Sequence, residues 1–103
     1  MQTEALIRAQ IHNNPVLIYM KGTPEIPMCG FSSRAVAILQ TYGIPFAHVN
    51  VLDHPEIRAT LPKMMNWPTF PQIYVRGELL GGCDILTEMH ENGELKAILA
   101  EVK

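Results

Sequence analysis

The chain has 103 residues, of which 48% are hydrophobic and 17% charged. That balance suits a single globular domain over residues 1–103 and leaves too little chain for two cores. The formal net charge of -2 gives no basic footprint for a nucleic acid or a membrane surface, and the longest apolar run, Pro15 to Met20, is far too short to span a bilayer. Two cysteines in a chain without a recognisable signal or transit segment indicate a reducing compartment, most simply the cytoplasm.

The first twenty residues predict a helix and then a buried strand. We expect the helix over residues 4–12, with Thr3 as its N-cap. Three apolar side chains of this helix are expected to face inward: Leu6, Ile7 and Ile11. Residues 16–20 are apolar without alternation, which is typical of a strand that is covered on both faces.

A loop, a second helix and a second strand follow. Residues 21–28 contain one glycine and two prolines and are expected to form the loop. From Phe31 onward, apolar residues recur at helical spacing up to Gly43, which is a natural C-terminal stop. The pattern over residues 46–51 favours the second strand.

The third helix has a clear start. Asp53 as an acidic N-cap, an early proline and Glu56 form a typical first turn. This helix is expected to bury Ile57 and Leu61 and to end at Pro62.

The last third of the chain predicts a hairpin and two helices. Residues 72–75 and 78–81 are expected to pair as antiparallel strands across Arg76–Gly77. Asp84 is the expected cap of a helix that reaches about His90. A last helix carries an apolar stripe made of Leu95, Ile98, Leu99 and Val102.

The predicted order of elements is therefore α-β-α-β-α-β-β-α-α. The first two strands are joined through a helix and should be parallel neighbours, whereas the last two pair antiparallel. The compact arrangement of these elements is an α/β fold, with a four-stranded mixed sheet flanked by helices on both faces.

Cys29 is the strongest candidate for a reactive residue. It lies between a loop and a helix, so we expect its sulfur above the helix N-terminus, near free backbone N–H groups. These groups, together with Lys21 at the end of the preceding strand, should lower the pKa of the thiol below the free value of about 8.5. The alternative is a cysteine that acts as a small buried hydrophobic residue.

Four short segments carry a resemblance to a known family: Lys21-Gly22, Cys29-Gly30-Phe31-Ser32, Trp67-Pro68-Thr69-Phe70-Pro71 and Gly81-Gly82-Cys83-Asp84. Over essentially its whole length the chain resembles a single-domain monothiol glutaredoxin of the Cys-Gly-Phe-Ser type. The loop over residues 23–27 is similar to the longer approach to the cysteine in this class. The resemblance implies a thioredoxin fold, a cis bond between Phe70 and Pro71, and a position of Pro71 beside Cys29.

The resemblance also implies a glutathione site with Cys29 as the reacting or ligating sulfur. Lys21 and Arg58 would meet the glycine carboxylate, Arg58 through a bidentate fork. The backbone of Phe70 would pair with the cysteine of glutathione as an added strand. The helix N-terminus at Cys83 and Asp84 would take the γ-glutamyl carboxylate, and Asp84 would also face the ligand's ammonium. Without the resemblance, Arg58 would be interpreted as a solvated surface residue.

Ser32 stands where a dithiol protein has its second cysteine, and a hydroxyl cannot resolve a mixed disulfide. A thiolate at Cys29 can instead ligate iron, but a [2Fe–2S] cluster needs about four ligands, so two chains and two glutathiones would share one cluster. The resemblance implies a cluster-loaded homodimer that acts in iron–sulfur cluster transfer, with a BolA-like protein and apo iron–sulfur proteins as partners. The alternative is a glutathione-dependent thiol–disulfide oxidoreductase working by a monothiol route, so the sequence leaves open whether the protein is an enzyme.

Three neighbours of this expected site have weaker assignments. A Cys29–Cys83 disulfide is conceivable in this fold and would compete with bound glutathione. Trp67 is expected to be a core aromatic residue, without a ligand contact, and Lys63 is an extra cation near the site with little to support it.

Overall fold

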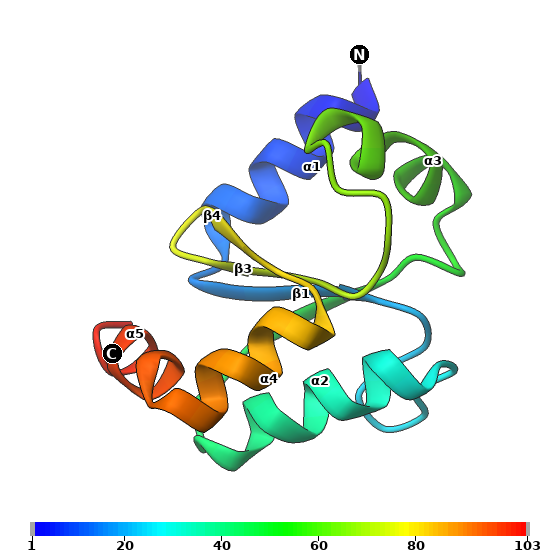
Figure 1. The fold of residues 1–103 in the computed structure, drawn as a ribbon. Helices are drawn as coiled ribbons and strands as arrows, with labels where there is room; N and C mark the ends of the chain where they lie inside the picture. The colour runs from blue at the N-terminus through cyan, green and yellow to red at the C-terminus, as the bar shows by residue number, and fades with distance from the viewer. Residues whose placement is uncertain (1, 103) are drawn as a thin grey trace.

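A computed structural model describes residues 2–102 and contains one four-stranded sheet between two groups of helices (Figure 1). The order of elements confirms the predicted one. The elements are α1 (Gln2–Asn13), β1 (Val16–Met20), α2 (Gly30–Thr41), β2 (Ala47–Asn50), α3 (Pro55–Met64), β3 (Gln72–Val75), β4 (Glu78–Gly81), α4 (Cys83–Asn92) and α5 (Glu94–Ala100).

The strands lie in the order β2-β1-β3-β4. β1 pairs parallel with β2, with Leu17 opposite Ala47, because the connection through α2 returns the chain in the same direction. β3 runs antiparallel to β1, with Ile18 opposite Ile73, and β4 pairs antiparallel with β3. The predicted mixed sheet and the hairpin across residues 76–77 are thus confirmed.

The core has two layers, one on each face of the sheet. In β1, alternate side chains enter different clusters, because successive residues of a strand point to opposite faces. Ile18 and Met20 pack with α2, α4 and α5, whereas Leu17 and Tyr19 pack with α1 and α3. Figure 1 shows the same division, with α1 and α3 on one side of the sheet and the other three helices on the opposite side. All five residues of β1 are buried, as the unbroken apolar run predicts.

The first helix differs from its prediction in two respects. Thr3 lies inside α1, which already includes Gln2, so it is not the N-cap. Leu6 is 47% exposed, although it was expected to face inward. Ile7 and Ile11 lie four positions apart and hold the helix on the core; Leu6 is rotated by about 100° from Ile7 and therefore faces solvent.

The third helix begins and ends later than the sequence pattern indicates. His54 occupies the N-cap position, while the carboxylate of Asp53 accepts a hydrogen bond from the Asn50 side chain at 3.2 Å. Pro62 does not end α3, which continues to Met64. A proline in the last turn removes one backbone hydrogen bond, and the buried Leu61 beside it still anchors the turn in the core.

Small shifts of this kind occur at other boundaries too. α2 begins at Gly30, one residue early, and β2 is shorter than the six residues expected. The N-cap of α4 is Gly82, so Asp84 lies in the first turn of that helix and its carboxylate is not the cap. Val102 lies beyond the end of α5, although it still packs against the core.

Candidate functional site

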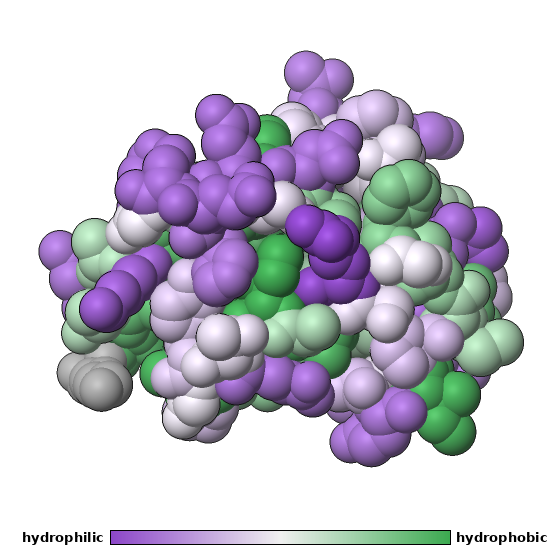
Figure 2. All heavy atoms as spheres, turned by 60° about the horizontal axis from the view of Figure 1, so that its bottom comes forward, coloured by the Kyte–Doolittle hydropathy of each residue, from purple (hydrophilic) through white to green (hydrophobic). Residues whose placement is uncertain are grey.

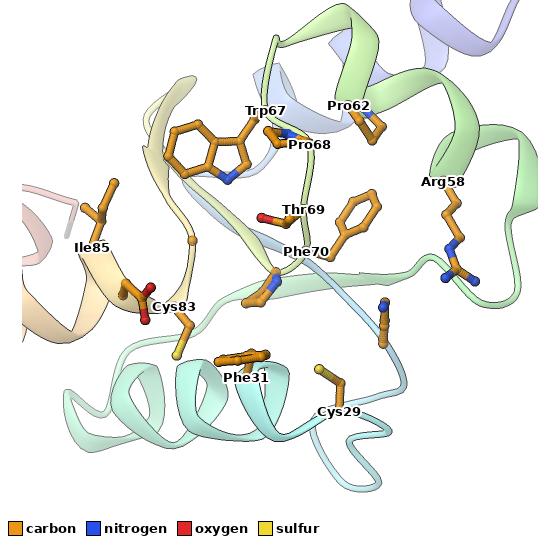
Figure 3. Close-up of a pocket in the computed structure, with 14 residues that line it drawn as sticks. Cys29, Phe31, Arg58, Pro62, Trp67, Pro68, Thr69, Phe70, Cys83 and Ile85 are labelled. Atoms are coloured by element: carbon orange, nitrogen blue, oxygen red, sulfur yellow. The ribbon is translucent and has the colours of Figure 1, made fainter.

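A cavity of about 750 Å³ lies at the end of the sheet where β1 leads into α2. Its walls come from the N-terminal ends of α2 and α4, from α3 and from the loop before β3 (Figure 3). The structure brings together all six residues that the sequence analysis assigned to a site: Lys21, Cys29, Arg58, Phe70, Cys83 and Asp84.

Cys29 is the N-cap residue of α2 and is partly exposed. The pKa of its thiol lies below the ordinary value, chiefly because the backbone N–H of Ser32 in the first turn of α2 favours the thiolate. Three smaller influences act in the same direction: the N–H of Phe31, the charge of Lys21 and the Ser32 hydroxyl. Together they outweigh the effect of partial burial, which raises the pKa. The lowered thiol pKa agrees with the prediction from the position of Cys29.

The loop before Cys29 is held by backbone hydrogen bonds. Met28 N–H donates to the Lys21 carbonyl at 2.9 Å, and Thr23 and Ile26 exchange backbone hydrogen bonds at 3.1 and 3.2 Å. Ser32, which is fully buried, accepts a hydrogen bond from Lys21 N–H at 3.1 Å. These hydrogen bonds therefore connect Lys21, which follows β1, to the first turn of α2 and to the residue before Cys29.

Charged groups of opposite sign line different walls of the cavity. Arg58 projects from α3 and is exposed, while its neighbour Ile57 is buried in the core. Figure 3 shows Arg58 across the cavity from Cys83, the first residue of α4, with Phe70 between them. Asp84 follows in the first turn of α4. Within residues 2–102, neither Lys21 nor Arg58 has a salt-bridge partner, so both cations are available to an anionic group.

The two cysteines differ in their surroundings. Cys29 faces the cavity and is partly exposed, whereas Cys83 is only 6% exposed and its sulfur lies 4.0 Å from the Thr87 hydroxyl oxygen. Both are free thiols in this structure. Cys29 is thus the thiol to which a ligand or substrate has access.

The loop before β3 forms the wall opposite α2. The Phe70–Pro71 peptide bond is cis, as the resemblance implied, and Pro71 lines the same cavity as Cys29. Trp67 also lines this wall, and its indole Nε1 is buried without a hydrogen-bond partner among residues 2–102.

Sequence reasoning missed several apolar lining residues. Phe31 is 62% exposed and lines the cavity next to Cys29, and Pro62 and Ile85 lie on other walls. The proximity of Phe31 to Cys29 in the sequence was a usable indication, whereas Ile85 could be placed only after α4 had been positioned. Lys63, considered as an extra cation, is not among the residues that line the cavity.

A four-stranded mixed sheet with an accessible low-pKa cysteine at a helix N-terminus, across from a cis-proline, defines the thioredoxin-fold class of thiol proteins. The sequence model described as Glutaredoxin matches residues 16–80. The chain is 57% identical over 102 residues to "Glutaredoxin 4" from Haemophilus influenzae (strain 86-028NP). The aligned residues make up 99% of this chain and 95% of that protein. The chain belongs to the glutaredoxin family.

Solved structures agree with this assignment. The solution structure of reduced poplar apo GrxS14 has a TM-score of 0.83 and 38% sequence identity, over 96% of this chain and 91% of that one. The crystal structure of a buckwheat glutaredoxin–glutathione complex has a TM-score of 0.85 and 25% identity, over 98% of this chain and 90% of that one. No helix within residues 2–102 is long and apolar enough to cross a membrane.

Proposed function

We propose that this chain is a monothiol glutaredoxin of the Cys-Gly-Phe-Ser type, which binds glutathione in the cavity beside Cys29. Glutathione has two carboxylates, one ammonium group and one thiol. The cavity offers two cations without a salt-bridge partner in the described part of the chain, Lys21 and Arg58, on one side and Asp84 with the first turn of α4 on the other. This distribution of charge around one accessible thiol is the observation that carries the proposal. The buckwheat glutaredoxin of similar fold was solved with glutathione.

The number of thiols favours a role in carrying a [2Fe–2S] cluster as cargo. Such a cluster takes about four ligands, mostly thiolates. Within residues 2–102, no three His, Cys, Asp or Glu side chains are placed to hold a metal ion together. Of the two cysteines, Cys29 is accessible and Cys83 is buried. One chain with one glutathione therefore supplies two sulfurs, and a complete ligand set requires a homodimer with two glutathiones.

The surface around Cys29 supports contact with a second copy. Ile26, Met28 and Phe31 are 68%, 64% and 62% exposed, and all three lie within three positions of Cys29. Figure 2 shows hydrophobic surface at the right-hand end of the molecule, where Figure 1 places the loop between β1 and α2. Apolar side chains at this end would be covered when two chains bring their Cys29 residues to one cluster.

A cluster at such an interface has half of its ligands from non-covalently bound glutathione, so it suits transfer more than storage. We therefore propose that the protein delivers clusters to apo iron–sulfur proteins and pairs with a BolA-like protein in the cytoplasm. Glutathione that dissociates from the cavity would release the cluster, and the proposed role is thus cluster transfer in iron–sulfur biogenesis and redox homeostasis.

A second candidate function is glutathione-dependent thiol–disulfide exchange, which the lowered pKa of Cys29 favours. The Cys29 thiolate would attack the glutathione sulfur of a glutathionylated protein, form a Cys29–glutathione disulfide and release the protein thiolate. A second glutathione thiolate would then attack this mixed disulfide, giving glutathione disulfide and regenerating Cys29.

Anaerobic reconstitution with ferrous iron, sulfide and glutathione separates the two candidates. We expect a coloured dimer for the wild type and a colourless monomer for Cys29→Ser. S-methylglutathione is the matched control, because it keeps the charged groups of glutathione but lacks a free thiol; with it, the wild type should also stay colourless. A colourless wild type that rapidly reduces glutathionylated substrates would overturn the cluster proposal in favour of the exchange reaction.

A further inference from the structure

Gln72 is a fully buried polar residue at the first position of β3, directly after Pro71. We infer that Gln72, held in place by Tyr74, is a positioning residue that turns the Thr69–Phe70 peptide so that Phe70 N–H faces the cavity. This inference rests on the proposed function, because it concerns the backbone that would pair with glutathione. Gln72 itself does not line the cavity, so it would act through the loop and not by contact with the ligand.

The side-chain amide of Gln72 is engaged at both of its ends. Its Nε2 donates to the carbonyl oxygen of Trp67 at 3.0 Å and to that of Thr69 at 3.3 Å. Its Oε1 accepts a hydrogen bond from the Tyr74 hydroxyl at 2.8 Å. The two backbone carbonyls determine which end of the amide faces the loop, because they only accept, and the Tyr74 hydroxyl then anchors the remaining oxygen end.

The bond to Thr69 determines the direction of the next N–H group. The Phe70–Pro71 bond is cis, whereas the Thr69–Phe70 bond is trans. In a planar trans peptide the C=O and N–H point in opposite directions. Because the Thr69 oxygen turns inward to buried Gln72, Phe70 N–H turns away from the core, and Phe70 is a lining residue of the cavity.

Besides the two hydrogen bonds from Gln72, the loop is held by a backbone hydrogen bond from Trp67 N–H to the Pro62 carbonyl at 3.0 Å, which lies at its far end from Phe70. Residues 67–70 belong to neither helix nor strand, and a backbone segment that adds a strand to a ligand gains affinity only if its N–H is already oriented. Gln72 supplies that orientation from inside the sheet, where it is paired with Tyr19 in the register of β1 and β3.

The chain contains a matched control for Tyr74. Tyr19 is also fully buried and packs edge-to-face against Tyr74, with ring centroids 5.6 Å apart. Its hydroxyl likewise donates to a glutamine, Gln10 of α1, at 2.8 Å. Both tyrosines thus donate to a glutamine Oε1, Tyr74 in a buried and Tyr19 in a partly buried hydrogen bond, but only the bond from Tyr74 leads to the loop before Pro71.

The test compares Gln72→Met, Tyr74→Phe and Tyr19→Phe with the wild type by calorimetric titration with reduced glutathione. Gln72→Met should weaken binding about tenfold, the value of one well-oriented hydrogen bond. Tyr74→Phe keeps both N–H donors of Gln72 but removes the hydrogen bond that anchors its Oε1. It should weaken glutathione binding roughly threefold. Tyr19→Phe should change the affinity less than about twofold, because the lost hydroxyl bonds to Gln10 of α1 and not to Gln72 or the loop.

Two further readouts separate positioning from general loss of structure. The pKa of Cys29 should stay unchanged in all three variants, because its causes lie in α2 and Lys21. In the ligand-free chain, hydrogen exchange at the backbone amides of Trp67, Thr69 and Phe70 should be faster for Gln72→Met and Tyr74→Phe than for Tyr19→Phe.

Equal loss of affinity in Tyr74→Phe and Tyr19→Phe would overturn the inference, and so would unchanged affinity in Gln72→Met. A wild type without affinity for glutathione would instead overturn the proposed function, and this is seen before any variant is measured.

Discussion

Gly22 closes the turn that presents Cys29, and its replacement by alanine tests this architecture. Gly22 has a φ of +93°, is buried, and forms an isolated bridge with Pro27. A Cβ at this position would lie 2.5 Å from the Ile26 carbonyl oxygen and 2.6 Å from the Met28 nitrogen. Both neighbours are backbone atoms, so the loop itself would have to move.

The expected loss of stability follows from these two effects. A positive φ costs alanine roughly 1 kcal/mol. Moving the loop also breaks the Met28-to-Lys21 hydrogen bond and the pair between Thr23 and Ile26, at about 1 kcal/mol for each weakened bond. With three such bonds, we expect Gly22→Ala to destabilise the fold by about 4 kcal/mol, which lowers the melting temperature by roughly 16 °C in a domain of this size.

Two other glycines separate the cost of a positive φ from the cost of the clash with the loop backbone. Gly43 has a φ of +64° but open space around its Cβ position, so Gly43→Ala should lose only about 1 kcal/mol. Gly30 has open space and no positive φ, and Gly30→Ala should be neutral or stabilising by roughly 0.5 kcal/mol.

Urea and thermal unfolding of the three variants give the stabilities, and absorbance of the thiolate against pH gives the Cys29 pKa. Gly22→Ala should raise that pKa toward its ordinary value, because the displaced loop carries Cys29 away from the N–H groups of α2. If Gly22→Ala is no less stable than Gly43→Ala, the backbone clash at Gly22 does not constrain the loop.

Two further predictions concern the sulfur. Because the folded chain lowers the pKa of Cys29, the thiolate stabilises the fold fully above the unfolded value of about 8.5, and this stabilisation is lost as the pH falls through the folded pKa. Urea unfolding across this range should therefore show a pH dependence in the wild type that Cys29→Ser lacks; parallel curves would contradict it. Ser32→Ala leaves Lys21 N–H without its acceptor, so it should lower the free energy of unfolding by about 1 kcal/mol. It should also raise the Cys29 pKa, because the Ser32 hydroxyl favours the thiolate. Unchanged stability or a lower pKa would contradict this prediction.

The sheet and the place of Cys29 could be predicted from local sequence pattern, whereas the grouping of Lys21, Arg58, Phe70, Cys83 and Asp84 around Cys29 was what the family resemblance implied. The unbroken apolar run of β1 requires burial on both faces, and the position of Cys29 between a loop and a helix requires an N-terminal turn beneath its sulfur. Arg58 could be placed on the outer side of α3 because Ile57 beside it had to be buried.

Other features depend on contacts between distant segments and could not be read from local pattern. Leu6 fits an apolar stripe as well as Ile7 does, and only the packing of α1 on the core decides which is exposed. Pro62 ends a helix by local rules, but the burial of Leu61 continues α3 past it. The buried amide of Gln72 had no sequence indication, because its partners are backbone carbonyls of a loop.

The two-layered core also governs how the cavity responds to change. Arg58 stands on a helix that packs in one layer, whereas Cys29 and Asp84 stand on helices that pack in the other, with the sheet between. The cavity therefore takes its walls from both layers, and a substitution that repacks one layer would shift the side chains of that wall relative to those of the other. A ligand that contacts Arg58 and the first turn of α4 together would link elements that pack on opposite faces of the sheet.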